Sequence, residues 1–281
     1  MKIDLLRKES ALSCIENYLL YLISQKKYTW EYIYFKSFVL LSDAIRGLNG
    51  DQDYSNYKGI ERLHNVAAEL GMVKIIRLPS STDLKELDGK WYAIQVSTDY
   101  MIQRYNFKPW RDDHHILMHN LPESGEVEYL NDVPSDAGVM TLDEAQKLSV
   151  GEIVVLDVED DVSGLDKKFF IEGTKEILRS FDLEKNTVND LKDSITLDAL
   201  RDAVSVAKVL VNRQNELVKI YGLSLSENDY YDYLSFVQSK LEYYRLRKSP
   251  AEKWMGMLEE VVIRDTAYIR MLKTVFQIEN N

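Results

Sequence analysis

Hydrophobic residues recur at two different spacings along the chain, and the change between them divides it in two. Spacings of three and four residues predict helices over residues 10–25 and 60–70, and again beyond residue 167. Between these regions, short apolar runs bounded by Gly, Pro and Asn predict strands. The predicted strands are 73–78, 91–96, 116–119, 127–130 and 153–158, and the later helices are 198–221, 230–247 and 253–276. This order predicts an α+β domain with an antiparallel sheet at residues 1–165, followed by a helical domain at 166–281.

Composition narrows the class of protein. The 281 residues carry a net charge of −11, which argues against a broad nucleic-acid-binding surface because such surfaces need an excess of Lys and Arg. No run of about 18 apolar residues predicts a membrane span, and no signal segment is recognisable, so we expect a cytoplasmic protein. A single cysteine excludes an internal disulfide framework and a cysteine-rich zinc site.

That single cysteine, Cys14, opens the first predicted helix. Ser13-Cys14-Ile15-Glu16 has the form of a capping box, with Ser13 as N-cap and Glu16 as its partner. Cys14 then lies in the first helical turn, where exposed N–H groups and the positive end of the helix dipole favour a thiolate. The alternative is that Cys14 is a small buried hydrophobe, as free cysteines commonly are.

Histidines gather at the start of one predicted strand. Three of the four histidines in the chain, His114, His115 and His119, lie within six residues. Zinc binding is one interpretation, since His115 and His119 share a strand face, but no cysteine is near to complete a tetrahedral set. A histidine that opens an apolar strand can instead serve as a general base, and either His114 or His115 fits this role.

The next predicted strand ends in Asn131-Asp132. The turn at residues 122–125 predicts a hairpin that brings Asn131 or Asp132 beside His114 and His115. A carboxylate or amide there could orient the imidazole. The alternative is that Asn-Asp followed by Pro134 is simply turn chemistry at a strand end.

A cysteine at a helix start, a histidine about 100 residues later and an Asn or Asp beyond it occur in the order of papain-fold cysteine enzymes. Residues 13–20, 91–100, 114–117 and 129–134 resemble the peptidase C39-like branch of that fold. They are similar to the N-terminal domain of the butirosin biosynthesis protein H family, acyltransferases of natural-product pathways. The resemblance covers roughly the first 160 residues. It implies Cys14 as nucleophile, His114 or His115 as base, and Asp132 or Asn131 as the orienting residue.

The resemblance also implies partners. It predicts acyl transfer, or thioester hydrolysis, in a nonribosomal-peptide or polyketide type of pathway. The donor would be a phosphopantetheine thioester on an acyl or peptidyl carrier protein, with no cofactor bound to this chain, and the acceptor a small amine or hydroxyl compound. Because carrier proteins are acidic, a basic landing site is expected, and the candidates are Arg245, Arg247, Lys248 and Lys253. The alternative is that these cations are a solvated helix end.

Two further alternatives stay open. A non-catalytic papain-fold scaffold or binding protein is suggested by Lys8, where many relatives have glutamine, and by Asn120-Leu121-Pro122, where the family usually has Gly-Tyr-Asp. A cysteine peptidase is the third reading. Among the 18 tyrosines, the groups at residues 230–233 and 243–244 are of the kind that line pockets or subunit interfaces, so a homodimer is also an expectation.

Overall fold

The protein divides into two units. The structure, a computed structural model, describes residues 13–26, 28–48, 63–109, 114–121, 124–189, 195–225 and 229–278. Of these, the first unit takes residues 13–30 and 63–163, and the second takes residues 31–48 and 164–278.

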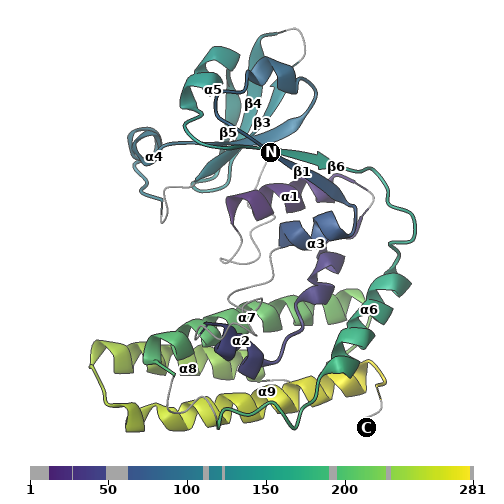
Figure 1. Cartoon of the computed structure of the whole chain (residues 1–281), viewed down its shortest axis with the longest axis vertical. Helices are drawn as coiled ribbons and strands as arrows, with labels where there is room; N and C mark the ends of the chain where they lie inside the picture. The colour runs from purple at the N-terminus through teal and green to yellow at the C-terminus, as the bar shows by residue number, and fades with distance from the viewer. Residues whose placement is uncertain are drawn as a thin grey trace. The chain divides into compact units, whose positions relative to one another are not determined.

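The first unit is built on a six-stranded sheet (Figure 1). The strands are β1 (Val73–Leu78), β2 (Trp91–Gln95), β3 (His115–Leu121), β4 (Glu126–Asn131), β5 (Asp136–Thr141) and β6 (Ile153–Val158). Their order is β1-β6-β2-β3-β4-β5, and every neighbouring pair is antiparallel. The predictions of an α+β fold, an antiparallel sheet and a β3–β4 hairpin are confirmed. β5 escaped prediction because half of its six residues are Asp, Gly and Thr, so it carries no strong apolar alternation.

Helices cover both faces of this sheet (Figure 1). On one face, α1 (Cys14–Ser24) packs its apolar side chains against alternate residues of the central strands. α3 (Leu63–Glu69) lies against α1 and β1. On the other face, a larger apolar cluster lies under η4 (Leu84–Leu87), α4 (Thr98–Tyr105) and α5 (Leu142–Leu148). The short helices α4 and α5 were not predicted, because about two turns give too few repeats to reveal a helical period.

The start of α1 follows the capping box predicted from the sequence. The Ser13 hydroxyl accepts a hydrogen bond from the Glu16 N–H at 3.2 Å, and one Glu16 carboxylate oxygen accepts from the Ser13 N–H at 2.9 Å. The other carboxylate oxygen accepts from the Leu63 N–H at 2.9 Å, at the start of α3. The same side chain therefore fixes where α1 begins and anchors a second helix beside it, so Cys14 is held in the first turn.

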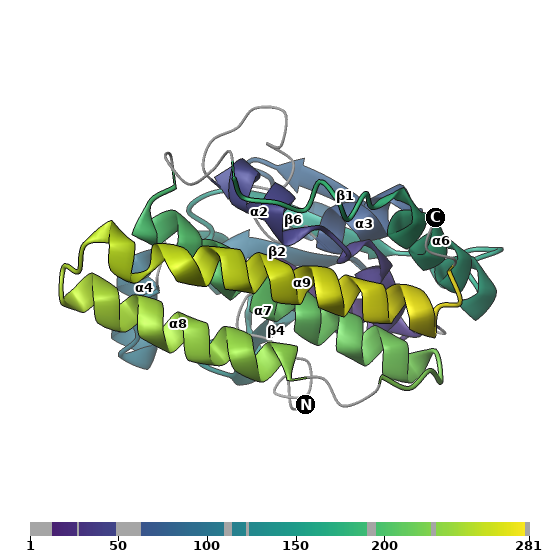
Figure 2. The ribbon, with the colours of Figure 1, turned by 90° about the horizontal axis from the view of Figure 1, so that it is seen from below.

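The second unit is helical. It contains α2 (Leu41–Leu48), α6 (Lys167–Ser180), α7 (Leu197–Ile220), α8 (Tyr230–Leu246), η5 (Ala251–Lys253) and α9 (Met255–Val275), and η2 (Trp30–Lys36) leads into it. α8 lies beside both α7 and α9 (Figure 2). The three long helices predicted from the sequence are confirmed to within a few residues at each end. Among the described residues, no helix is long and apolar enough to cross a membrane.

Residues 31–48 belong to the helical unit and not, as predicted, to the N-terminal domain. Their backbone is held by side chains from far along the chain: Gln214 donates to the Ser37 carbonyl at 2.8 Å. Asp265 accepts from the Leu41 N–H at 3.0 Å, and Asn186 accepts from the Ser42 N–H at 3.3 Å. The other predicted boundary, after residue 165, lies two residues from the observed one. Contacts over such separations leave no local pattern in the sequence, which is why only this second boundary could be predicted.

Candidate active site

Cys14 and His115 meet at one end of the sheet. The Sγ of Cys14, in the first turn of α1, lies 3.7 Å from Nδ1 of His115, the first residue of β3. Cys14 is partly buried and His115 is almost fully buried. This distance is within hydrogen-bonding range for a sulfur atom, so a proton can pass between thiol and imidazole. Of the two candidate histidines, the structure brings His115 to the cysteine.

The register of the sheet explains why His115 points at α1. Alternate residues of a strand share a face, and Leu117, two residues beyond His115, packs against α1. His115 is paired with Gln95 of β2. Continuing the β3–β4 pairing of Leu117 with Leu130 by two residues places Asp132 on the other side of His115. The sheet therefore presents a row of polar side chains to the N-terminal end of α1.

Asp132 is hydrogen-bonded to α1. One of its carboxylate oxygens accepts a hydrogen bond from Asn17 Nδ2 at 2.9 Å, and the other lies 3.5 Å from the Tyr18 hydroxyl. The same hydroxyl donates to the His115 carbonyl at 2.7 Å and accepts from the Asp132 N–H at 3.3 Å. Burial, with the nearby charges of Asp132 and Cys14, raises the pKa of Tyr18 well above its usual value, so the phenol stays a donor. Tyr18 thus bridges β3 and β4 where their own ladder ends.

We expect Tyr18→Phe to lower the free energy of unfolding by about 1–3 kcal/mol, because it strands a buried carbonyl and a buried N–H. Urea denaturation followed by circular dichroism measures the loss. Tyr243→Phe is the matched control: Tyr243 is 53% exposed, so deletion of its hydroxyl should change stability by less than about 0.5 kcal/mol. Equal effects of the two substitutions would contradict the bridging role of Tyr18.

His114 forms a separate pair with the Asn-Asp turn. Its Nε2 lies 2.7 Å from Asn131 Oδ1 and 4.0 Å from Asp132 Oδ1. Asn131 also donates from Nδ2 to the Pro134 carbonyl at 2.9 Å. The five predicted residues therefore come together in two groups, Cys14 with His115, and His114 with Asn131 and Asp132. Asn131 and Asp132 lie beside His114, whereas Cys14 lies beside His115.

Glu152 is the residue that sequence reasoning missed. It directly precedes β6, and its Oε1 lies 3.8 Å from Nε2 of His115, on the ring edge opposite to Cys14. Because β6 lies beside β2 and not beside β3, its closeness to His115 depends on strand order. The only signal in the sequence is its position: Val154, two residues on, faces α1. The strand order together with this two-residue spacing would place Glu152 on the α1 side of the sheet.

The remaining predicted residues lie elsewhere. Lys8 falls outside the described residues. Arg245, Arg247, Lys248 and Lys253 are all exposed, at the end of α8 and in η5 of the helical unit. Arg245 pairs with Glu242 at 2.6 Å, and the Arg247 guanidinium lies 5.6 Å from the centre of the Tyr243 ring. Within the described part of the chain, no three His, Cys, Asp or Glu side chains are grouped as a metal ion would require.

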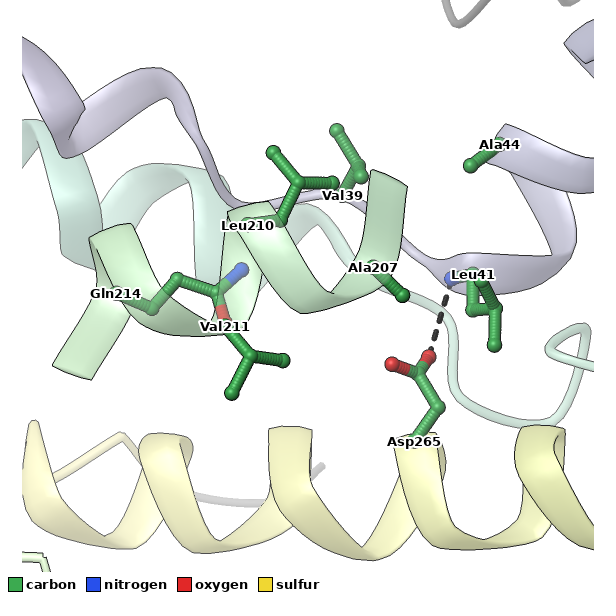
Figure 3. A pocket seen from close by; sticks show the side chains of 8 residues that line it. All are labelled: Val39, Leu41, Ala44, Ala207, Leu210, Val211, Gln214 and Asp265. Atoms are coloured by element: carbon green, nitrogen blue, oxygen red, sulfur yellow. Dashed lines mark hydrogen bonds between the residues drawn. The ribbon is translucent and has the colours of Figure 1, made fainter. Parts of the chain in front are cut away.

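A small pocket occurs in the helical unit (Figure 3). Its volume is about 240 Å³, which includes space open to solvent, and it is lined by Val39, Leu41, Ala44, Ala207, Leu210, Val211, Gln214 and Asp265. Figure 3 shows the Asp265 carboxylate directed from α9 toward the Leu41 backbone. Burial raises the pKa of Asp265 to about 6. The lining contains no nucleophile for acyl transfer, so the Cys14–His115 pair remains the candidate site.

No protein-family model and no curated protein matches the chain. The geometry of the site is therefore the basis for a proposed function.

Proposed function

We propose that the protein is a cysteine-dependent acyltransferase or thioesterase that carries the acyl group on Cys14. The observation that carries this proposal is the 3.7 Å contact between Cys14 Sγ and His115 Nδ1 at the N-terminus of α1. A thiol in that position has both an adjacent base and the positive end of a helix dipole, the two features that activate a cysteine.

The chemistry follows from these groups. His115 takes the thiol proton, and the Cys14 thiolate attacks the carbonyl carbon of an acyl thioester. The tetrahedral oxyanion is stabilised by N–H groups in the first turn of α1, which no carbonyl within the helix can reach. Collapse expels the donor thiolate, which takes the proton from the His115 imidazolium. An amine, hydroxyl or water then attacks the acyl-Cys14 carbonyl, gives its proton to His115 and releases the Cys14 thiolate.

The proposal includes a papain-like fold for the first unit. Support comes from a helix with a cysteine in its first turn, packed on an antiparallel sheet whose strand β3 opens with the contacting histidine. The sequence resemblance described above favours a natural-product pathway and a carrier-protein thioester as donor. The exposed cations Arg245, Arg247, Lys248 and Lys253 are then candidates for carrier docking.

The test is to incubate the protein with the acetyl thioester of N-acetylcysteamine and measure intact mass. We expect one added acetyl group on the folded protein and none on Cys14→Ala, because the chain has no other cysteine. Subsequent addition of an amine or of buffer alone separates transferase from thioesterase activity by the product formed.

Urea-unfolded wild-type protein is the control for simple thiol reactivity. Acetylation at the same rate with and without the fold would mean that the fold does not activate Cys14. Absence of an adduct, or an adduct that persists in Cys14→Ala, would contradict the proposal. Absence would favour a non-catalytic binding protein.

A further inference from the structure

Glu152 completes a line of polar groups that begins at Cys14. His115 lies between them, with Nδ1 3.7 Å from the sulfur and Nε2 3.8 Å from the Glu152 carboxylate. The same oxygen, Glu152 Oε1, also forms an ion pair with Arg77 of β1. The groups are therefore arranged in the order sulfur, imidazole, carboxylate, guanidinium across one end of the sheet.

The sheet fixes the backbone of Glu152. Its N–H donates to Gln95 Oε1 at 3.2 Å, and its carbonyl accepts from the Gln95 N–H at 3.1 Å. Gly151 leaves room for this arrangement, since a Cβ there would lie 1.9 Å from Gln95 Oε1. Gln95 is also the cross-strand partner of His115. One residue of β2 thus sets the position of Glu152 and His115 together.

We propose that Glu152 is the positioning residue for His115, in place of the expected Asn131 or Asp132. This inference rests on the proposed function of Cys14 and deepens it. A carboxylate 3.8 Å from Nε2 is at ion-pair distance, so it stabilises the imidazolium that forms when the thiol gives up its proton and favours the ring orientation with Nδ1 toward the sulfur. Asn131 and Asp132 are engaged with His114, Asn17 and Tyr18.

Removal of the Glu152 charge could either speed or slow the reaction of the Cys14 sulfur. The direction of the change separates two ways in which Glu152 could act. If its charge acted directly on Cys14, its removal would stabilise the thiolate and speed the reaction of the sulfur. If it acts through His115, its removal destabilises the imidazolium and slows that reaction. The Glu152 side chain is 37% exposed, so the effect is that of a partly solvated pair, about threefold.

The experiment measures the rate of alkylation of Cys14 by iodoacetamide at pH 7. Since Cys14 is the only cysteine, the reagent reports on this site without any substrate. We expect Glu152→Gln to react about threefold more slowly than wild type. In a His115→Gln background, the same substitution should give no slowing, because the group it acts through is gone. Asp157→Asn is the matched control: it removes an equal charge from an exposed position in β6, five residues and about 17 Å along the strand from Glu152, and should leave the rate unchanged.

An unchanged or faster rate in Glu152→Gln, or equal slowing with and without His115, would overturn this inference. The outcome is distinguishable from failure of the proposed function. If Cys14 is acetylated but Glu152→Gln leaves its alkylation rate unchanged, only the proposed role of Glu152 is contradicted. If alkylation follows the expected pattern but no acetyl adduct forms, the proposal of acyl transfer is contradicted and the positioning of His115 by Glu152 is supported.

Discussion

Replacement of His115 by alanine is expected to slow acetylation of Cys14 by about 100- to 10,000-fold, the range for loss of a general acid–base group. The reason is the contact described above: His115 Nδ1 lies 3.7 Å from the sulfur, and it is the histidine that the structure brings to Cys14. The measurement is the initial rate of thioester acylation by intact mass, at pH 7 and saturating donor.

His114→Ala is the control that the chain itself offers. It removes the adjacent imidazole, which pairs with Asn131 at 2.7 Å, and should leave the acylation rate close to that of wild type. His115→Gln serves as a second variant that keeps the volume of this buried side chain, and circular dichroism establishes that each variant is folded. A larger loss in His114→Ala than in His115→Ala would reverse the assignment of the base.

The second large effect is expected on the free energy of unfolding, when the buried carboxyl of Asp265 is replaced. This carboxyl is fully buried between α9, the start of α2 and α8, and burial raises its pKa from 3.8 to about 6. Hydrogen bonds from the Leu41 N–H, Asn186 and the Tyr230 hydroxyl oppose that rise without cancelling it. The folded protein thus keeps a proton on Asp265 that the unfolded chain gives up.

The direction of the pH dependence follows from this difference. The stability from the retained proton is complete below about pH 4 and is lost as pH rises through about 6. The loss by pH 7 amounts to roughly 3 kcal/mol, at 1.36 kcal/mol for each unit of pKa difference. We therefore expect Asp265→Asn to gain about that much relative to wild type between pH 4 and pH 7.

Urea denaturation of both proteins across this pH range measures the difference. The test compares how the free energy of unfolding of each protein changes with pH. Weaker hydrogen bonds from the introduced asparagine would lower the whole curve of the variant without changing its slope with pH. Tyr230→Phe provides a second check. It removes a hydrogen bond that lowers the Asp265 pKa, so the loss of stability should occur at a higher pH than in wild type. Parallel stability curves for wild type and Asp265→Asn would show that this carboxyl does not titrate in that range.

Local patterns in the sequence predicted the local parts of the fold. Ser13 and Glu16 predicted the start of α1 correctly, because a capping box is complete within four residues. The long helices α7, α8 and α9 carry several turns of repeat. In contrast, β5 and α5 are too short or too polar to show a period, and the transfer of residues 31–48 to the helical unit depends on partners beyond residue 180.

The residues of the candidate site also differ in whether a local sequence pattern could predict them. Cys14, His114, His115, Asn131 and Asp132 were all selected from the sequence, and each lies in one of two neighbouring groups. Which histidine faces the cysteine depends on a single residue of strand register, which the sequence leaves open. The closeness of Glu152 depends on β6 lying beside β2, an order that no local pattern contains. The bridging role of Tyr18 depends on its hydroxyl lying between β3 and β4, a placement that no local pattern contains.

The discontinuous helical unit has a consequence for synthesis of the protein. Leu41 leaves the ribosome 224 residues before Asp265, the side chain that binds its N–H. At about 5–20 residues per second, residues 31–48 wait roughly 10–45 seconds for α9. All six strands and α1 are complete before then, so the sheet unit can form while Leu41, Ala44 and Ile45, buried in the finished protein, lack their covering helices. Until the later helices are made, residues 31–48 therefore form an apolar segment without its covering partners, which is the kind of surface that chaperones bind.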